Sequence, residues 1–186
     1  MIGRSGRRWL GGIVDLGGNV GDMPAGTPAW RDMEVGAPHI ARLGLARLDA
    51  TRVAMLGTVR HDGSPRISPV EPCLANGCLL VGAMAWSAKA ADLCRDPRYV
   101  LHSAVTDPVS GEGELKLHGR AAKASPALRR EAAAGWWSGQ SAEQAVVFVL
   151  GIDQAVFVEW DTEHGVMTVH RWSPQGGYGH IARTYP

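Results

Sequence analysis

Lys89 is the residue whose position most strongly suggests chemistry. It lies in the stretch AWSAKAADLC, two residues after Ser87, where a short helix is expected to begin. A cation in the first turn of a helix is disfavoured, because the free backbone N–H groups there carry partial positive charge. An anion bound at that helix end, held by these N–H groups, the Ser87 hydroxyl and the lysine, would offset the penalty. Lys89 is therefore either a phosphate ligand or a solvated surface residue.

Arg66 is a second candidate for binding a phosphate. In the segment PRISPV it alternates with Ser68 and Val70, so the three side chains share one face of an extended strand. The planar guanidinium group can donate two parallel hydrogen bonds to a phosphate. The alternative is a surface arginine that pairs with Glu71 or Glu34.

Other reactive side chains give weaker signals. The sequence contains no GxSxG, HExxH or P-loop motif. His102 and His118 lie on successive expected strands, and they are either ordinary strand histidines or a ligand pair for haem or a metal. Cys73, Cys78 and Cys94 lack metal-ligand spacing and are expected to be reduced thiols. From these spacings we expect no metal site and assign no catalytic acid or base.

The elements that must position these residues are short strands joined by tight turns. We expect strands over 52–60, 65–74, 78–86, 98–106, 114–124, 145–152, 154–161 and 166–172, and helices over 37–50, 87–95 and 127–137. The turns between the first three strands are too short for parallel crossovers. The pattern therefore predicts an antiparallel barrel with flanking helices, followed by a loop-like tail from residue 173.

Composition limits the class of protein. The 186 residues carry a net charge of +1, which gives no indication of a nucleic-acid or membrane partner. No apolar run reaches the length of a membrane span. Residues 1–36 are rich in glycine, and their apolar stretch is broken by Asp15, unlike a signal peptide. We expect a flexible extension over 1–36, a single domain over 37–186, and a cytoplasmic location.

A set of short motifs resembles the pyridoxamine 5′-phosphate oxidase-like split-barrel family of flavin-binding proteins. Each motif alone is weak, and their order along residues 50–121 carries the resemblance. The motifs are Asp62-Gly63-Ser64-Pro65, Pro69-Val70, Ser87-Ala88-Lys89-Ala90-Ala91-Asp92-Leu93, Asp96-Pro97-Arg98 and Gly119-Arg120-Ala121.

This resemblance implies a six-stranded antiparallel split β-barrel of Greek-key topology that forms a homodimer, with a flavin at the subunit interface. It implies that the phosphate is held by Lys89 and Ser87, with Arg66 and Ser68 next. The flavin ring would lie near Pro69, Val70 and Trp86, although Trp86 is equally compatible with packing at a strand end. Arg171 and Trp172 of the partner subunit would approach the ring.

The implied function is an FMN-dependent oxidoreductase that transfers hydride to or from a small molecule. The sequence departs from the family at Ala83-Met84-Ala85, where many members carry a hydroxyl residue that contacts the phosphate. The alternatives are therefore a reductase that uses the deazaflavin F420, a haem-binding protein, and a flavin-binding dimer without catalytic activity.

Overall fold

The computed structural model of the protein describes residues 26–104, 113–136 and 145–185. The helices in this part are α1 (Trp30–Gly36), α2 (Pro38–Thr51), α3 (Ala88–Arg95) and α4 (Pro126–Trp136). The strands are β1 (Ala54–Val59), β2 (Pro65–Val70), β3 (Pro72–Ala75), β4 (Cys78–Met84), β5 (Arg98–Ser103), β6 (Glu114–Lys123), β7 (Ala145–Asp161), β8 (Val166–Ser173) and β9 (Gly177–Thr184).

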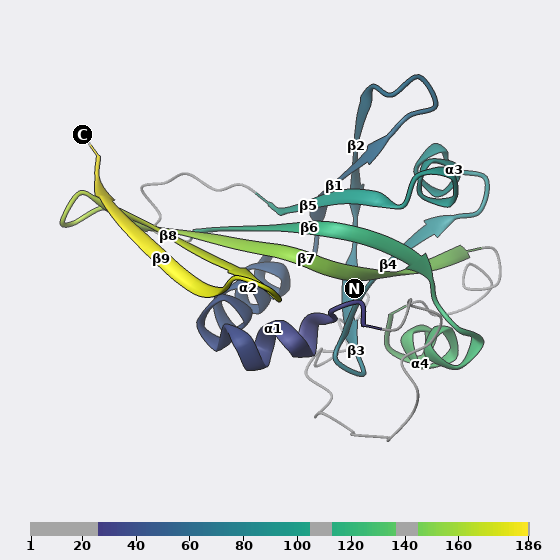
Figure 1. Cartoon of the computed structure of the whole chain (residues 1–186). Helices are drawn as coiled ribbons and strands as arrows, with labels where there is room; N and C mark the ends of the chain where they lie inside the picture. Colours follow the sequence, from purple (N-terminus) through teal and green to yellow (C-terminus); the bar gives the residue numbers. More distant parts are fainter. Residues whose placement is uncertain (1–25, 105–112, 137–144, 186) are drawn as a thin grey trace, which may run out of the picture.

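The strands form one antiparallel sheet in the order β2-β1-β5-β6-β7-β4-β3 (Figure 1). β2 and β3 are two halves of one bent segment, which turns at Glu71. β2 pairs with β1, whereas β3 pairs with β4, so this bend connects the two edges of the sheet. Prolines at 65, 69 and 72 suit this position, because a proline cannot donate to a further strand. The expected split barrel with flanking helices is confirmed.

The expectation of two separate strands over 145–152 and 154–161 was wrong, because residues 145–161 form the single strand β7. Its first part pairs with β4, its last part pairs with β8, and β6 runs along both parts. The register of β6 against β7 shifts between His118 and Gly119. A Cβ on Gly119 would lie 1.8 Å from the Gly151 carbonyl oxygen, so this close approach requires glycine.

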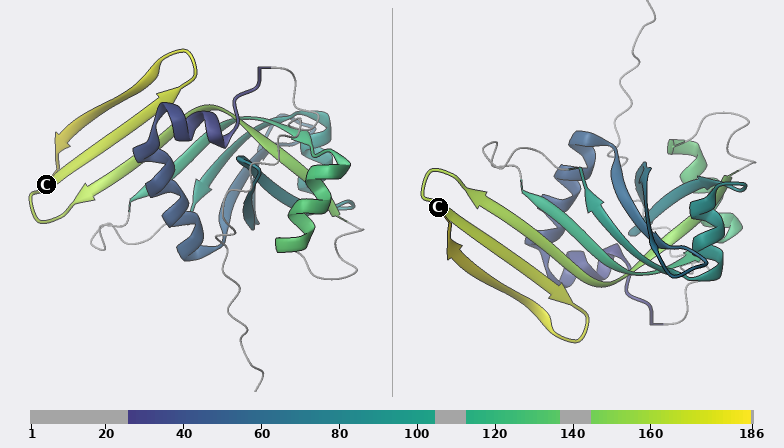
Figure 2. Two further views of the ribbon diagram at one scale, coloured as in Figure 1. Left: turned by 90° about the horizontal axis from the view of Figure 1, so that it is seen from below. Right: turned by 90° about the horizontal axis from the view of Figure 1, so that it is seen from above.

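Both ends of the described chain contain more structure than expected. β9 forms from the tail that we expected to be a loop, and it pairs only with β8, so that β7, β8 and β9 extend beyond the barrel (Figure 2). At the other end, α1 begins inside the expected flexible extension. Trp30 and Met33 are fully buried, and burial of these large side chains stabilises the helix. Residues 1–25 of that extension lie outside the described residues.

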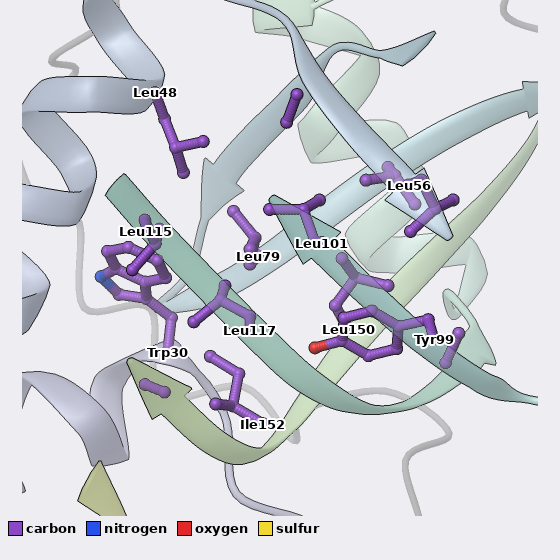
Figure 3. Close-up of a cluster of buried hydrophobic side chains, with 14 of the residues drawn as sticks. Trp30, Leu48, Leu56, Leu79, Tyr99, Leu101, Leu115, Leu117, Leu150 and Ile152 are labelled. Carbon is purple, nitrogen blue, oxygen red and sulfur yellow. The ribbon is translucent and has the colours of Figure 1, made fainter. Parts of the chain in front are cut away.

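The core lies between the barrel strands and the first two helices. Figure 3 shows Trp30 beside Leu115 and Leu117 of β6, with further leucines from β1, β4, β5 and β7 around them. The Tyr99 hydroxyl is buried and donates to the Gly151 carbonyl oxygen at 2.9 Å, and burial raises the pKa of Tyr99. A second apolar cluster, around Leu128 and Leu80, fixes α4 against β3, β4 and β7.

Helix ends follow the expected chemistry. Ser87 is the N-cap of α3, and its hydroxyl accepts from the Ala90 N–H at 3.4 Å. Ser125 accepts in the same way from Leu128 at the start of α4, where Pro126 is the first helical residue. Cys73 and Cys78 are buried thiols, and Cys94 is an exposed one. None of the described helices has both the length and the apolar character needed to cross a membrane.

Candidate functional site

The first turn of α3 lies against β2. Lys89 donates a hydrogen bond from Nζ to the Pro69 carbonyl oxygen at 2.8 Å. This contact explains how a lysine is accommodated at the positive end of a helix, because a carbonyl oxygen of the neighbouring strand accepts from the cation. The two segments that the sequence indicated separately, Ser87 to Lys89 and Arg66 to Val70, therefore form one site.

Asp92 is the centre of this site. Its Oδ2 accepts from Arg66 Nε at 2.6 Å and from Thr58 Oγ1 at 2.9 Å, and its Oδ1 lies 3.3 Å from Arg95 Nη2. The Asp92 side chain is only 5% exposed, whereas that of Arg66 is 26% exposed. Arg95 also donates to the Val59 carbonyl oxygen. Asp92 thus binds Arg66 through Nε, and this hydrogen bond does not use the two terminal nitrogens of the guanidinium.

The charges of the site favour an anion. Lys89, Arg66 and Arg95 are cations; Arg66 and Arg95 contact the Asp92 carboxylate, whereas Lys89 contacts only the neutral Pro69 carbonyl among the interactions of the described residues. Burial alone would raise the pKa of Asp92, but the hydrogen bonds from Arg66, Thr58 and Arg95 outweigh it and hold the pKa below its ordinary value. Burial lowers the pKa of Lys89. Because cations outnumber carboxylates, an anionic group would be attracted to this surface.

Three further residues expected at the site, Ser68, Pro69 and Val70, lie on β2, and Trp86 directly precedes the α3 cap. Ser68 is half-buried and shares a face with Arg66, and Val70 on that face is buried. Pro69 points to the other face and is exposed. Trp86 lies one residue before the α3 cap and is 81% exposed, so it does not pack at the strand end. An aromatic side chain of this size in solvent is available for stacking.

Comparisons with solved structures identify this arrangement of strands. The chain resembles PhzG from Burkholderia lata in complex with tetrahydrophenazine-1-carboxylic acid, with 12% identity, a TM-score of 0.60, and coverage of 90% of this chain and 100% of that one. It also resembles a pyridoxamine 5′-phosphate oxidase-related, FMN-binding protein from Nostoc punctiforme, with 14% identity, a TM-score of 0.56, and coverage of 82% and 97%. This chain has the pyridoxamine 5′-phosphate oxidase-like split-barrel fold.

A haem-binding protein from Mycobacterium smegmatis shares this split barrel, with 17% identity, a TM-score of 0.50, and coverage of 77% of this chain and 88% of that one. The sequence matches no protein-family model and no curated protein. The structural similarity at these identities therefore establishes the fold, whereas the chemistry of the site depends on its own residues.

Within the split barrel, Trp172 does not join the Lys89 site. It is 4% exposed and packs against α1, where a Cβ on Gly36 would lie 2.3 Å from its Nε1. A role for Trp172 at the flavin of a partner subunit is not supported, because its ring would have to leave the core. Arg171 is exposed on the other face of β8.

The two strand histidines lie on the same face of the sheet as Met55, with which His102 registers across β1 and β5. In the β5–β6 register, Val100 faces His118 and His102 faces Lys116, so the histidines are diagonal neighbours on one face. His102 Nδ1 lies 2.6 Å from the Ser103 carbonyl oxygen, and its Nε2 lies 3.6 Å from Glu114.

Sequence reasoning missed Thr58, Asp92 and Arg95 as site residues. Asp92 belongs to the motif that carried the resemblance, at i+3 from Lys89, a spacing that places both on one side of a helix. That spacing was the available signal for Asp92. No signal marked Thr58, because its partner is 34 residues away in the chain.

Proposed function

We propose that this chain binds FMN at the α3–β2 site and functions as an FMN-dependent oxidoreductase. The observation that carries the proposal is that two cations connect α3, with its capped N-terminus, to β2 of the split barrel: Lys89 of α3 donates to the Pro69 carbonyl, and Arg66 of β2 donates to Asp92. FMN ends in a phosphate, and helix N–H groups, lysine and arginine are the donors that proteins use for phosphates.

The phosphate would be bound by four side chains of one chain. Lys89 supplies a point charge, and Arg66 supplies the guanidinium that Asp92 orients. The Ser87 hydroxyl and Ser68 on the Arg66 face add neutral donors. Ala83, Met84 and Ala85 provide no hydroxyl at the end of β4, so the phosphate would depend more strongly on these four side chains.

The ring of the cofactor would lie along β2 and the end of β4. The exposed Pro69 ring and the backbone at Val70 would contact the flavin on the β2 side, and the exposed Trp86 ring is available to stack on the flavin or on a substrate. A bound flavin supplies hydride transfer, and the residues of this chain would orient it and exclude water. We assign no side chain the transfer of a proton.

A homodimer would complete this site. The outer face of β2, β1 and β5 exposes Met55, Ile67 and Val100, which are 38%, 70% and 37% exposed. Ile67 and Val100 both register with Gly57, so the two side chains flank a strand position that has no side chain. Met55 registers with Pro69, the residue that Lys89 contacts, so this apolar face adjoins the proposed cofactor site.

Cofactor titration is the deciding experiment. Purified protein would be examined for a visible spectrum, and then titrated with FMN, F420 and haem in parallel. We expect saturable binding of FMN and a flavin spectrum in extracted cofactor. A colourless protein that fails to bind FMN would contradict the proposal, and saturation by F420 alone would replace FMN with the deazaflavin.

Haem binding is the second candidate, because one structure of the same fold is described as a haem-binding protein. His102 and His118 lie on one face of β5 and β6 and offer imidazole ligands there. A Soret band that disappears in His102→Ala or His118→Ala would favour this function. Turnover with a nicotinamide or quinone partner would separate an enzyme from a flavin-binding dimer without activity.

A further inference from the structure

A cluster of two histidines and one glutamate lies between α2 and the β7–β8 pair. His39 Nε2 is 2.9 Å from Glu159 Oε2, and His170 Nε2 is 2.6 Å from the same oxygen. The three ligand atoms lie within 4.8 Å of one another. Two imidazoles and a carboxylate form the donor set that proteins use for zinc and non-haem iron.

The fold explains why these three residues meet. Glu159 and Phe157 are two residues apart on β7 and so share a face of the sheet, and His170 on β8 registers with Phe157. His170 and Glu159 are therefore diagonal neighbours on one face. α2 packs on β7, and its first turn brings His39 to that face.

His170 is held as a ligand would be held. Its Nδ1 lies 2.8 Å from the Tyr178 hydroxyl, which orients the ring and directs Nε2 toward Glu159. The side chain is 8% exposed, and although Nε2 is close to the Glu159 carboxylate, the two are not aligned for a hydrogen bond. A buried ring nitrogen without an aligned partner is costly in the ligand-free protein, and a metal ion would satisfy it.

We propose that His39, Glu159 and His170 bind a divalent first-row transition metal ion, with water completing the coordination. The His39 and Glu159 side chains are 38% and 39% exposed, so one side of the cluster is open to solvent. Such a site, with three protein ligands and open positions, resembles catalytic rather than structural metal sites. His180 registers with His170 across β8 and β9 and lies on the same face, at a ring-centroid distance of 5.8 Å.

This site is independent of the proposed flavin site. The two sites lie near opposite ends of β7. Lys89 follows β4, whose last residue pairs with the first residue of β7, whereas Glu159 is near the last residue of β7. The α2 and α3 helices accordingly lie on different sides of the barrel (Figure 1). Loss of metal binding and loss of FMN binding can therefore be measured separately.

The test uses tag-free, full-length protein stripped of metal, titrated with Zn²⁺ by calorimetry and with Co²⁺ by visible absorption. We expect one equivalent per chain, a weakening of at least about tenfold in Glu159→Gln and in His170→Ala, and an increase in thermal stability with Zn²⁺ only where the site is intact. If His170→Ala does not fold, His39→Ala should show the same loss of Zn²⁺ affinity, because His39 is half-exposed and its replacement disturbs the core less.

His164→Ala is the matched control, because His164 is an exposed histidine of the β7–β8 turn that pairs with Asp161 outside the cluster. It should bind Zn²⁺ as the wild type does. Absence of saturable binding to the wild type would overturn the proposal, as would binding that persists unchanged in Glu159→Gln and His39→Ala.

Discussion

The Lys89 ammonium group and the Pro69 carbonyl oxygen are joined by a hydrogen bond of 2.8 Å, which ties the first turn of α3 to β2. A backbone carbonyl is a neutral acceptor, so this contact leaves the positive charge of the lysine uncompensated. A phosphate at the same helix end would compensate it. The contact therefore holds the lysine in position for an anion.

Replacing Lys89 with alanine should weaken FMN binding by about 1–3 kcal/mol, the scale of one charge-assisted phosphate contact. The measurement is the FMN dissociation constant from fluorescence titration, at two salt concentrations. Lys123→Ala is the control, because Lys123 is an exposed lysine at the end of β6. An unchanged constant in Lys89→Ala would mean that the phosphate is bound elsewhere.

The pH dependence of stability should reveal Asp92. Its pKa in the folded protein lies below the ordinary value, since Arg66, Thr58 and Arg95 donate to the carboxylate. The stability that it contributes is thus fully present above its ordinary pKa and is lost as the pH falls through the folded pKa. Denaturant unfolding of the wild type should therefore show a free energy of unfolding that declines below about pH 5.

Asp92→Asn should reduce the free energy of unfolding at neutral pH by about 2–4 kcal/mol, because Arg66 and Arg95 lose their common anion at a buried position. The decline in acid should also become shallower in this variant. Glu163→Gln removes an exposed carboxylate of the β7–β8 turn and should change neither quantity. An equally steep acid limb in Asp92→Asn would assign the decline to other carboxylates.

Features of the fold and the site that depend on residues close together in the chain could be predicted from the sequence, whereas features that depend on distant residues could not. The Asp62-Gly63 turn, the Ser87 cap and the stop of α3 before Pro97 depend on neighbours in the chain, and all three were predictable. The α3–β2 contact followed only from the ordered motifs. It could not be derived from spacing alone, because Lys89 and Pro69 are 20 residues apart.

The missed elements depend on partners distant in the sequence. β9 contains glycine and all of its residues are exposed, so it lacks the apolar alternation that marks a half-buried strand, and pairing with β8 determines it. β7 is continuous because β6 pairs with it along both parts. The metal-ligand cluster joins His39 to Glu159 across 120 residues, so no spacing rule could indicate it.

From the exposed apolar face of β2, β1 and β5 we expect a dimer, which a single charged substitution on that face should disrupt. Ile67→Glu places a carboxylate on the β2–β1–β5 face, where it would have to be buried against a second subunit. We expect the variant to be monomeric by analytical ultracentrifugation at concentrations at which the wild type is dimeric. Val35→Glu, at a residue of α1 that is 87% exposed, should leave the assembly unchanged. A monomeric wild type would remove this face from the proposed site.

The glycine of the GRA motif should be required for folding. A Cβ on Gly119 would lie 1.8 Å from the Gly151 carbonyl oxygen and 2.8 Å from its carbonyl carbon, both backbone atoms that cannot rotate away. Gly119→Ala should therefore cost about 3 kcal/mol or more in the free energy of unfolding, through displacement of β6 from β7 at the register shift. Gly179→Ala offers a matched comparison in β9, because no atom lies within 4 Å of its added Cβ. Chemical denaturation of both variants checks the prediction, and equal stabilities would show that β6 and β7 separate readily at this point.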